Sequence, residues 1–346
     1  TIQYKWLLEI TSDNASITAV GDDDQSIYGW RGAKVENVDA FTKTFSDTEI
    51  IRLEQNYRST NIILGAANAL IENNTDRLGK NLWTEQLEGE PIILYQAYNE
   101  QDEARFVADI LKDWMSKGEL YSDATVLYRS NAQSRAIEEA LLRVSIPYRI
   151  YGGLRFYERM EIKNAISYLK IIFNNSDNPA FERSISNPTR GVGEKTLAKI
   201  RAAALKFNIS YIKASARLID EGAISGRGGA GLRSYLEFVA RCKEFIEENA
   251  LSDLMEEIIK TSGLHAYHAK EPGEKGKTRI ENLEELVTAT KNFEQSIAEN
   301  KTNKEVAEEY LDVISLDSGD RQASESDDAA QLMTLHSAKG LEFKLV

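Results

Sequence analysis

The sequence predicts an α/β fold that carries a large all-helical insertion. Strand-like and helix-like runs alternate from Ile17 to Tyr151, and only helical periodicity follows from Glu161 to Leu316. One more strand-like run, Gln331–Leu335, comes near the end. Alternation of strands with helices is typical of parallel sheets, because parallel strands need a long connection that brings the chain back.

The first part of the chain supplies the strands. Short runs rich in apolar residues predict five of them, at Ile17–Val20, Glu49–Leu53, Pro91–Ala97, Ala124–Tyr128 and Tyr148–Tyr151. Amphipathic stretches predict three helices, at Thr60–Asn73, Gln101–Lys117 and Gln133–Val144. The stretch Asn81 to Pro91 reads as a seam, so we expect one sheet region in residues 1–90 and a second in residues 91–157.

The helical insertion is expected over residues 158–328. Helical periodicity marks seven segments, Glu161–Phe173, Glu194–Phe207, Ser210–Leu218, Ala230–Asn249, Leu251–Thr261, Thr278–Ser296 and Lys304–Leu316. Loop signals separate them at Asn174–Pro179, Gly222–Gly231 and Pro272–Gly276. Asp317–Asp328, rich in Ser, Asp and Glu, reads as a return linker, and residues 329–346 rejoin the second sheet.

Composition limits the class of protein. The 346 residues hold one Cys and three His with no ligand spacing, which argues against a disulfide or a zinc site and fits a reducing cytoplasm. No run is long enough to span a membrane, so no membrane partner is expected. Taken alone, a net charge of −13 argues against a nucleic-acid-binding protein. It does not exclude one, because a local basic groove can bind nucleic acid while the remaining surface is acidic.

The stretch from Val20 to Ala33 carries the densest chemistry. Its sequence is Val-Gly-Asp-Asp-Asp-Gln-Ser-Ile-Tyr-Gly-Trp-Arg-Gly-Ala, at the end of a predicted strand. Ligands of open α/β sheets bind at such ends. Gln25 could orient a water or sense a phosphate, Tyr28 and Trp30 offer flat faces to bases, and Arg31 could bind phosphate. Alone, the stretch would equally suit an acidic turn with two half-buried aromatics.

Five further sequence blocks favour a functional site over a simple acidic turn. They are Leu53–Thr60, Val126–Arg135, Tyr151–Arg159, Thr278–Leu286 and Thr334–Phe343. In content, order and spacing, the six blocks together resemble the superfamily 1 DNA helicases of the UvrD/Rep/PcrA type, over essentially the whole chain. The last blocks lean toward the UvrD branch. The resemblance implies two partial RecA-like P-loop NTPase cores with parallel sheets, and a helical inserted domain of the type called 2B.

The resemblance also implies an ATP site with Mg²⁺. Arg58 resembles the residue that contacts the γ-phosphate, and Gln25 the residue that links the γ-phosphate to DNA contacts. Both are therefore the candidate catalytic residues. Tyr57 resembles the residue that stacks on adenine, and Glu342 the acid that hydrogen-bonds the ribose. A surface ion pair for Arg58 and a core position for Tyr57 remain alternatives. No residue of this chain is expected to be a metal ligand.

Single-stranded and duplex DNA are the implied partners, together with DNA repair proteins. The candidate single-strand contacts are Tyr28, Trp30, Arg31, Arg129, Asn131, Arg155, His336 and Lys339; the last two could instead relay to Gln25. A Gly-apolar-Gly hairpin between two helices looks like a duplex-binding helix-hairpin-helix element, since glycines let backbone pass close to phosphate. Its candidate residues are Thr189, Arg190, Gly191, Gly193 and Lys195. A plain helix–helix turn is the alternative.

Some family motifs do not occur in this sequence. The phosphate-binding loop Gly-x-x-x-x-Gly-Lys-Ser/Thr is absent. We expect the acidic box before Thr1 and the last Arg-containing motif after Val346, so the chain is expected to be the central fragment of an ATP-dependent 3′–5′ DNA helicase. Alone it should not hydrolyse ATP. The alternatives are the motor arm of a helicase–nuclease complex and a non-enzymatic DNA-binding module.

Overall fold

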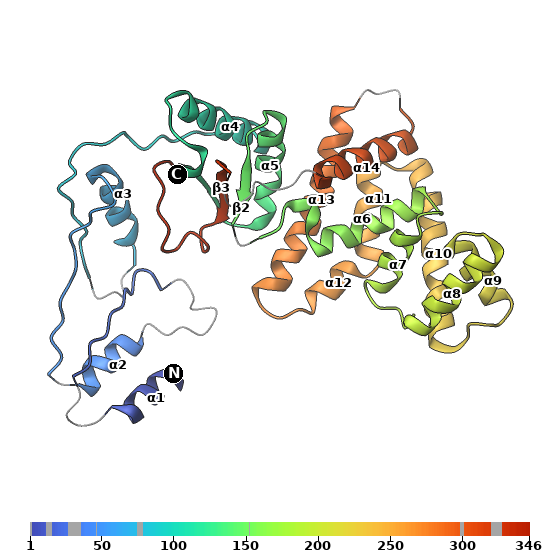
Figure 1. Ribbon diagram of the computed structural model, residues 1–346, viewed down its shortest axis with the longest axis horizontal. Coiled ribbons are helices and arrows are strands. Elements are labelled where there is room, and N and C mark those ends of the chain that lie inside the picture. Colours follow the sequence, from blue (N-terminus) through green and yellow to red (C-terminus); the bar gives the residue numbers. More distant parts are fainter. Residues whose placement is uncertain are drawn as a thin grey trace. The chain divides into compact units, whose positions relative to one another are not determined.

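The computed structural model describes residues 2–11, 16–26, 36–45, 47–74, 79–151, 153–297, 301–319 and 327–346 (Figure 1). The chain forms two compact units. The first unit holds Thr1–Ala97 and Ala338–Glu342, and the second holds Tyr98–Ser337 and Phe343–Val346. The segment Ala338–Glu342 thus belongs with the first unit, although both of its neighbours along the chain belong to the second.

The first unit contains the helices α1 (Ile2–Ile10), α2 (Glu36–Thr44) and α3 (Asn61–Ile71). The helix predicted at 60–73 is confirmed as α3, which follows the extended backbone of Thr60. The strands predicted at 17–20, 49–53 and 91–97 are not strands here. A strand needs a neighbour for its backbone hydrogen bonds, and the described part of this unit pairs none of these runs. Their apolar side chains are accordingly open, with Leu53 82% and Leu94 95% exposed.

The second unit contains the parallel sheet that the sequence predicts. Its strands are β1 (Thr125–Tyr128), β2 (Tyr148–Ile150) and β3 (Ala330–Thr334), in the order β1-β3-β2. Leu332 of the central strand pairs with Val126 on one side and Ile150 on the other. The helices α4 (Glu100–Ser116) and α5 (Ser134–Arg143) pack on each other and cover the sheet. We call these five elements the sheet domain.

Nine helices of the described chain form the rest of the second unit, the helical domain (Figure 1). They are α6 (Met160–Phe173), α7 (Asn178–Ser186), α8 (Glu194–Phe207), α9 (Tyr211–Asp220), α10 (Gly226–Glu248), α11 (Leu251–Thr261), α12 (Leu264–Ala269), α13 (Glu274–Ser296) and α14 (Asn303–Gly319). All seven predicted helices are confirmed. Two helices, α7 and α12, were not predicted, and α10 begins inside the predicted loop 222–231.

The helical domain has its own apolar core. Tyr168 and Leu169 of α6, Leu232 of α10 and Leu254 of α11 are fully buried at its centre. Because this core is separate from the one beneath the sheet, the helical domain does not depend on the sheet for its burial of apolar area. Within the described residues, no helix combines the length and the apolar character needed to cross a membrane.

Candidate functional site

Two contacts in the first unit join residues from three predicted motifs. The Gln25 amide closes the acidic turn by donating from Nε2 to Asp22 Oδ2 at 2.7 Å. Lys339 donates from Nζ to the Gln25 carbonyl at 2.8 Å. Three residues further along, Glu342 forms an ion pair with Arg58 Nε. The structure thus brings Lys339 to Gln25 and Glu342 to Arg58, although more than 300 residues separate Gln25 from both Lys339 and Glu342.

Arg58 and Tyr57 are both accessible from solvent. The Arg58 side chain is 58% exposed and its partner Glu342 is 65% exposed. Asn56 positions this segment, because its Oδ1 accepts hydrogen bonds from the backbone N–H groups of Arg58 and Ser59 at 2.9 and 2.8 Å. Tyr57 is 75% exposed and donates its hydroxyl proton to Gln55 Oε1 at 2.8 Å. An open ring beside an open guanidinium can take a flat base next to a phosphate.

Lys80 is a functional candidate that the sequence did not reveal. The carboxylates of Asp22, Asp23 and Asp24 lie within 4.8 Å of one another, and Lys80 pairs with Asp22 and Asp24. Partial burial opposes ionisation of Asp22, yet hydrogen bonds from Lys80 and Gln25 and the charge of Lys80 hold the pKa of its carboxyl below the usual range. Asp22, at the start of the turn that carries Gln25, is therefore ionised and paired with a lysine.

Three predicted single-strand contacts, Tyr28, Trp30 and Arg31, lie outside the described residues. The other candidates from the second unit follow the strands β1 and β3. Arg129 is exposed and follows β1 directly, Asn131 is half-buried, and His336 follows β3. Leu335 N donates to Tyr128 O at 2.9 Å, so both strands end at one edge of the sheet. Carboxyl edges of parallel strands are where such sheets bind ligands.

Arg155, unlike these residues, is buried. It is only 2% exposed, donates from Nε to the Tyr148 hydroxyl at 2.9 Å, and lies over the Tyr148 ring. Its guanidinium stabilises the core beneath β2, where a strand of DNA cannot reach it. The prediction of a DNA contact overlooked that the adjacent Phe156 and Tyr157 are buried and draw the preceding residue inward. We leave Arg155 out of the proposed DNA contacts.

The predicted hairpin lies between α7 and α8. Thr189, Gly191, Gly193 and Lys195 are exposed there. Gly191 has φ +75°, which favours glycine, and Gly193 precedes the first turn of α8. Arg190 is instead turned inward. It donates to the carbonyls of Ser184, Pro188 and Ser262 and packs over the rings of Tyr168 and Tyr235. Arg190 thus holds the hairpin in place and is not an open phosphate contact.

The start of α10 packs against this hairpin. A Cβ at Gly231 would lie 1.9 Å from the Arg190 carbonyl oxygen, and one at Gly228 would lie 3.3 Å from the Gly191 carbonyl oxygen. No side chain fits at Gly231, so the two backbone segments touch directly. Sequence reasoning read Gly222–Gly231 as a loop. The repeated glycines, followed at once by a long helical pattern, were the available signal of close backbone packing.

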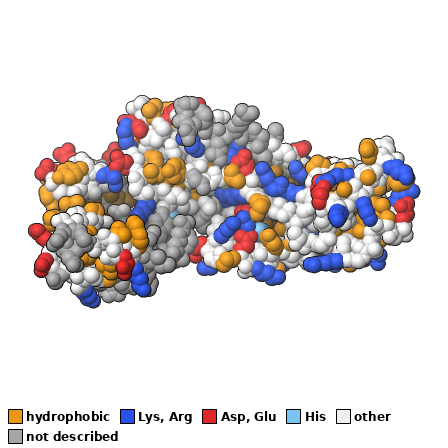
Figure 2. Space-filling model, turned by 60° about the horizontal axis from the view of Figure 1, so that its bottom comes forward, with side chains coloured by type: hydrophobic (Ala, Val, Ile, Leu, Met, Phe, Trp, Pro, Cys, Tyr) orange, Lys and Arg blue, Asp and Glu red, His pale blue; other side chains and the backbone are white. Residues whose placement is uncertain are grey.

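The helical domain exposes basic side chains despite the acidic whole. Figure 2 displays one face of the protein, on which Lys and Arg side chains spread over the helical domain with Asp and Glu between them. Exposed basic residues near the hairpin include Lys195, Lys199 and Arg227. A locally basic surface is compatible with binding a phosphate backbone even at a net charge of −13.

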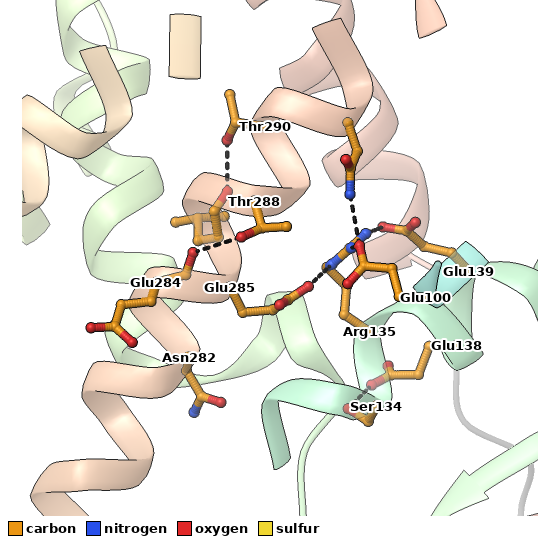
Figure 3. A network of polar contacts seen from close by, with 12 residues as sticks. Glu100, Ser134, Arg135, Glu138, Glu139, Asn282, Glu284, Glu285, Thr288 and Thr290 are labelled. Carbon is orange, nitrogen blue, oxygen red and sulfur yellow. Dashed lines mark hydrogen bonds and ion pairs between the residues drawn. The ribbon is translucent and has the colours of Figure 1, made fainter. Parts of the chain in front are cut away.

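Buried arginines join the two domains of the second unit. Figure 3 shows Arg135 of α5, which is 2% exposed, among the carboxylates of Glu100, Glu139 and Glu285. Burial favours the neutral form, but the carboxylates of Glu139 and Glu285 raise the pKa of Arg135, so it stays charged. Because Glu285 belongs to α13 and Glu100 to α4, this one guanidinium ties the sheet domain to the helical domain.

Comparison with known proteins identifies the family. Residues 51–346 match the model of the UvrD-like helicase C-terminal domain, and residues 1–46 match that of the UvrD/REP helicase N-terminal domain. DNA helicase II of Escherichia coli strain K12 is 51% identical over 345 residues, which are 100% of this chain and 48% of that protein. ATP-dependent DNA helicase PcrA of Bacillus subtilis strain 168 is 39% identical over 347 residues, 99% of this chain and 47% of the relative.

The chain spans about half the length of the curated relatives it matches. One family model covers most of the chain, the predicted motifs lie within the two matched regions, and the parallel sheet with its helical insertion is the fold that the motifs imply. The chain therefore belongs to the family of UvrD-like helicases.

Proposed function

We propose that the full-length gene product is an ATP-dependent 3′–5′ DNA helicase, which translocates on single-stranded DNA and unwinds duplex DNA. The observation that carries this proposal is a pair of contacts, Lys339 with Gln25 and Glu342 with Arg58, through which one motif touches two others. A helicase must change its contacts with DNA when the bound nucleotide changes. Contacts between the nucleotide-binding and DNA-binding motifs can provide this link.

ATP is the proposed cofactor, and the described residues fit part of it. The open ring of Tyr57 suits the adenine, the carboxylate of Glu342 suits the ribose hydroxyls, and the fork of Arg58 suits a phosphate. Bound ATP supplies the phosphoryl group whose transfer to water drives the motor. Arg58 would hold negative charge and Gln25 would orient a hydrogen bond. We propose Mg²⁺ as well but assign it no ligand in this chain, since Lys80 pairs with the described acidic turn.

Single-stranded and duplex DNA are the proposed substrates. Arg129, Asn131 and His336 follow strands at one sheet edge, and Thr189, Gly191, Gly193 and Lys195 form the exposed part of the hairpin. Tyr28, Trp30, Arg31 and Lys339 remain proposed strand contacts. Backbone N–H groups and lysines read phosphates without regard to sequence, as a moving helicase requires. A role in DNA repair with repair proteins as partners, a cytoplasmic location, and the domain limits 1–90, 91–157, 158–328 and 329–346 are part of the same proposal.

Removal of Arg58 tests the proposal. In the full-length gene product, Arg58→Ala should lower kcat for DNA-stimulated ATP hydrolysis by about a hundredfold or more while the KM for ATP changes little, because the lost contact acts mainly in the transition state. Arg52→Ala, at an exposed arginine of the same unit, is the matched control. DNA binding without any ATP hydrolysis by the wild type would favour the non-enzymatic module, and an attached nuclease activity would favour the motor arm.

A further inference from the structure

Arg159 makes contacts that no other described side chain of the second unit combines. It precedes α6 and is 7% exposed. Its Nη1 donates to the Asn131 carbonyl at 2.8 Å and to Asn282 Oδ1 at 2.9 Å. Its Nη2 donates to Ser134 Oγ at 2.7 Å. One planar group thus joins the turn after β1, the start of α5, and α13 of the helical domain.

Each acceptor of Arg159 is itself fixed. Asn282 is 2% exposed and donates from Nδ2 to Glu161 Oε1 at 2.6 Å, which sets the direction of its amide. Ser134 Oγ donates to Glu138 Oε1 at 2.6 Å, and the Glu138 carboxylate lies 3.8 Å from Arg159 Nη2. Figure 3 shows Asn282 on α13 and the Ser134–Glu138 contact on α5. Because its hydrogen-bond partners on both sides are fixed, the guanidinium keeps the sheet domain and the helical domain in a defined position relative to each other.

The segment that Arg159 holds is the one that carries candidate strand contacts. Asn131 opens a single turn of 3-10 helix, Asn131–Gln133, two residues after Arg129. Gln133 Oε1 accepts hydrogen bonds from the N–H groups of Arg129 and Ser130, both at 2.9 Å. Arg159 holds the Asn131 carbonyl from the opposite direction, so the turn has little freedom to move independently of α13.

We propose that Arg159 is a positioning residue that fixes the Arg129–Gln133 turn against α13, so that single-strand contacts in the sheet domain and duplex contacts in the helical domain move as one body. This rests on the proposed function and names the residue that couples its two DNA contacts. Loss of the coupling leaves ATP hydrolysis running while fewer base pairs open per ATP, because strand movement no longer pulls on the duplex from a fixed position.

The neighbouring Arg135 provides a matched control. It is also buried and also reaches α13, through Glu285, although it lies on α5 and Arg159 precedes α6. Its side-chain hydrogen bonds go to Glu100, Glu139 and Glu285, none of which belongs to the turn 129–133. Arg→Lys at either position keeps one charge but loses the planar fork. A purely structural role predicts equal effects of the two substitutions at equal loss of stability.

The experiment compares Arg159→Lys with Arg135→Lys in the full-length gene product, at temperatures where both lie equally far below their Tm. For Arg159→Lys we expect the DNA concentration that half-saturates ATP hydrolysis to rise about tenfold, the equivalent of one lost positioning contact of about 1.4 kcal/mol. Base pairs opened per ATP should fall several-fold. Arg135→Lys should change neither quantity by more than about twofold.

A second variant separates the two halves of the contact. Asn282→Ala removes the link to α13 but leaves the Asn131 carbonyl bonded to Arg159, so half-saturation by single strands should stay near wild type while base pairs opened per ATP fall. This variant also carries the test if Arg159→Lys does not fold. Equal effects of Arg159→Lys and Arg135→Lys, or unchanged unwinding per ATP in Asn282→Ala, would overturn the inference. Absence of DNA-stimulated hydrolysis in the wild type would instead count against the proposed function.

Discussion

At the scale of single residues, burial divides the arginines into two groups. Arg135 and Arg155 are each 2% exposed and bonded to neighbouring side chains, whereas the Arg58 side chain is 58% exposed. A guanidinium never loses its charge under ordinary conditions, so each buried one needs acceptors nearby. The exposed guanidinium of Arg58 is accessible to a ligand, whereas the buried guanidinium groups of Arg135 and Arg155 stabilise the surrounding fold.

Two substitutions of Tyr57 distinguish the contribution of its ring to nucleotide binding from that of its hydroxyl. Tyr57→Ala in the full-length gene product should raise the KM for ATP about tenfold, because stacking on a base contributes about 1–3 kcal/mol. Tyr57→Phe keeps the ring and loses only the hydrogen bond to Gln55, so its KM should stay within about twofold. Steady-state ATP hydrolysis at saturating DNA measures both. A larger effect of Tyr57→Phe than of Tyr57→Ala would refute the stacking role.

At the scale of elements, the hairpin and α10 depend on each other through backbone contact. The Arg190 carbonyl occupies the space that a side chain at position 231 would need. Arg190 in turn is held by the carbonyls of Ser184 and Ser262, on the far side of the hairpin. The exposed glycine face of the hairpin is therefore presented on a rigid support and not on a free loop.

Gly231→Ala tests this dependence against the expectation from helix propensity. Alanine at an interior helix position usually stabilises by about 1 kcal/mol relative to glycine. Here the built Cβ lies 1.9 Å from a backbone oxygen, so we expect a net loss of about 2–3 kcal/mol in the free energy of unfolding, measured by urea titration. Gly193→Ala, where nothing lies within 4 Å of the Cβ, should cost less than about 1 kcal/mol.

The pair Glu182–Arg201 links α7 to α8 and gives the helical domain a pH dependence. Arg201 donates to both carboxylate oxygens at 2.5 and 2.8 Å, and these hydrogen bonds hold the pKa of Glu182 below its ordinary value of 4.5. A depressed pKa means that the pair stabilises the fold above pH 4.5 and that this contribution is lost as the pH falls through the lowered pKa.

Glu182→Gln should therefore lower the free energy of unfolding at pH 7 by only about 0.5 kcal/mol, since both side chains are about a third exposed and solvent screens them. The difference between variant and wild type should shrink as the pH drops below 4.5. Urea titrations at several pH values measure it. A difference that grows toward acid pH would show that another group is responsible.

The elements that the sequence predicted well are those with strong periodicity. The seven long helices and the parallel pairing of the strands follow from alternation and amphipathic pattern, whereas the strand order β1-β3-β2 was not predicted. The sequence analysis does not predict helix α7, because Pro179 resembles a loop signal, although proline is favoured in the first turn of a helix. Runs such as 49–53 have strand composition, but composition cannot supply the neighbouring strand that makes a strand.

The residues of the candidate site were also only partly predictable from the sequence. Gln25, Arg58 and Glu342 were named from motifs, and the structure adds that Arg58 contacts Glu342 and that Lys339 contacts Gln25. Lys80 was missed because its partner lies 58 residues earlier, and an ion pair over that distance leaves no local pattern. The surroundings of Arg155 and Arg190 could not be predicted, because a sequence shows the charge of an arginine but not the carbonyls or rings that enclose it.

At the scale of the whole molecule, charge is distributed unevenly. The chain has a net charge of −13, yet the helical domain shows a face with many Lys and Arg side chains (Figure 2). The acidic remainder opposes non-specific attachment of DNA elsewhere, while local cations attract phosphate within about a Debye length, roughly 10 Å at 0.1 M salt. Binding should therefore depend on these local cations and should weaken with salt.

Lys195→Ala tests the charge argument on a duplex with a 3′ single-stranded tail. If the lysine neutralises one phosphate, the slope of log K against log salt should become shallower by about 0.9. Lys206→Ala, at an exposed lysine near the other end of α8, should leave the slope unchanged. Fluorescence anisotropy of the full-length gene product over a range of salt concentrations gives both slopes. Identical slopes for the three proteins would exclude the hairpin from the duplex interface.

The strand order has a consequence for the timing of folding during synthesis. β3 is the central strand, and both β1 and β2 pair with it, yet the ribosome makes it after the whole helical domain. At typical elongation rates the gap between β2 and β3 lasts roughly 10 to 40 seconds. The helical domain, with its own core, can close in that interval, while β1 and β2 wait with unpaired edges. A substitution that slows the helical domain would prolong this exposure and favour aggregation of the nascent chain before the sheet is sealed.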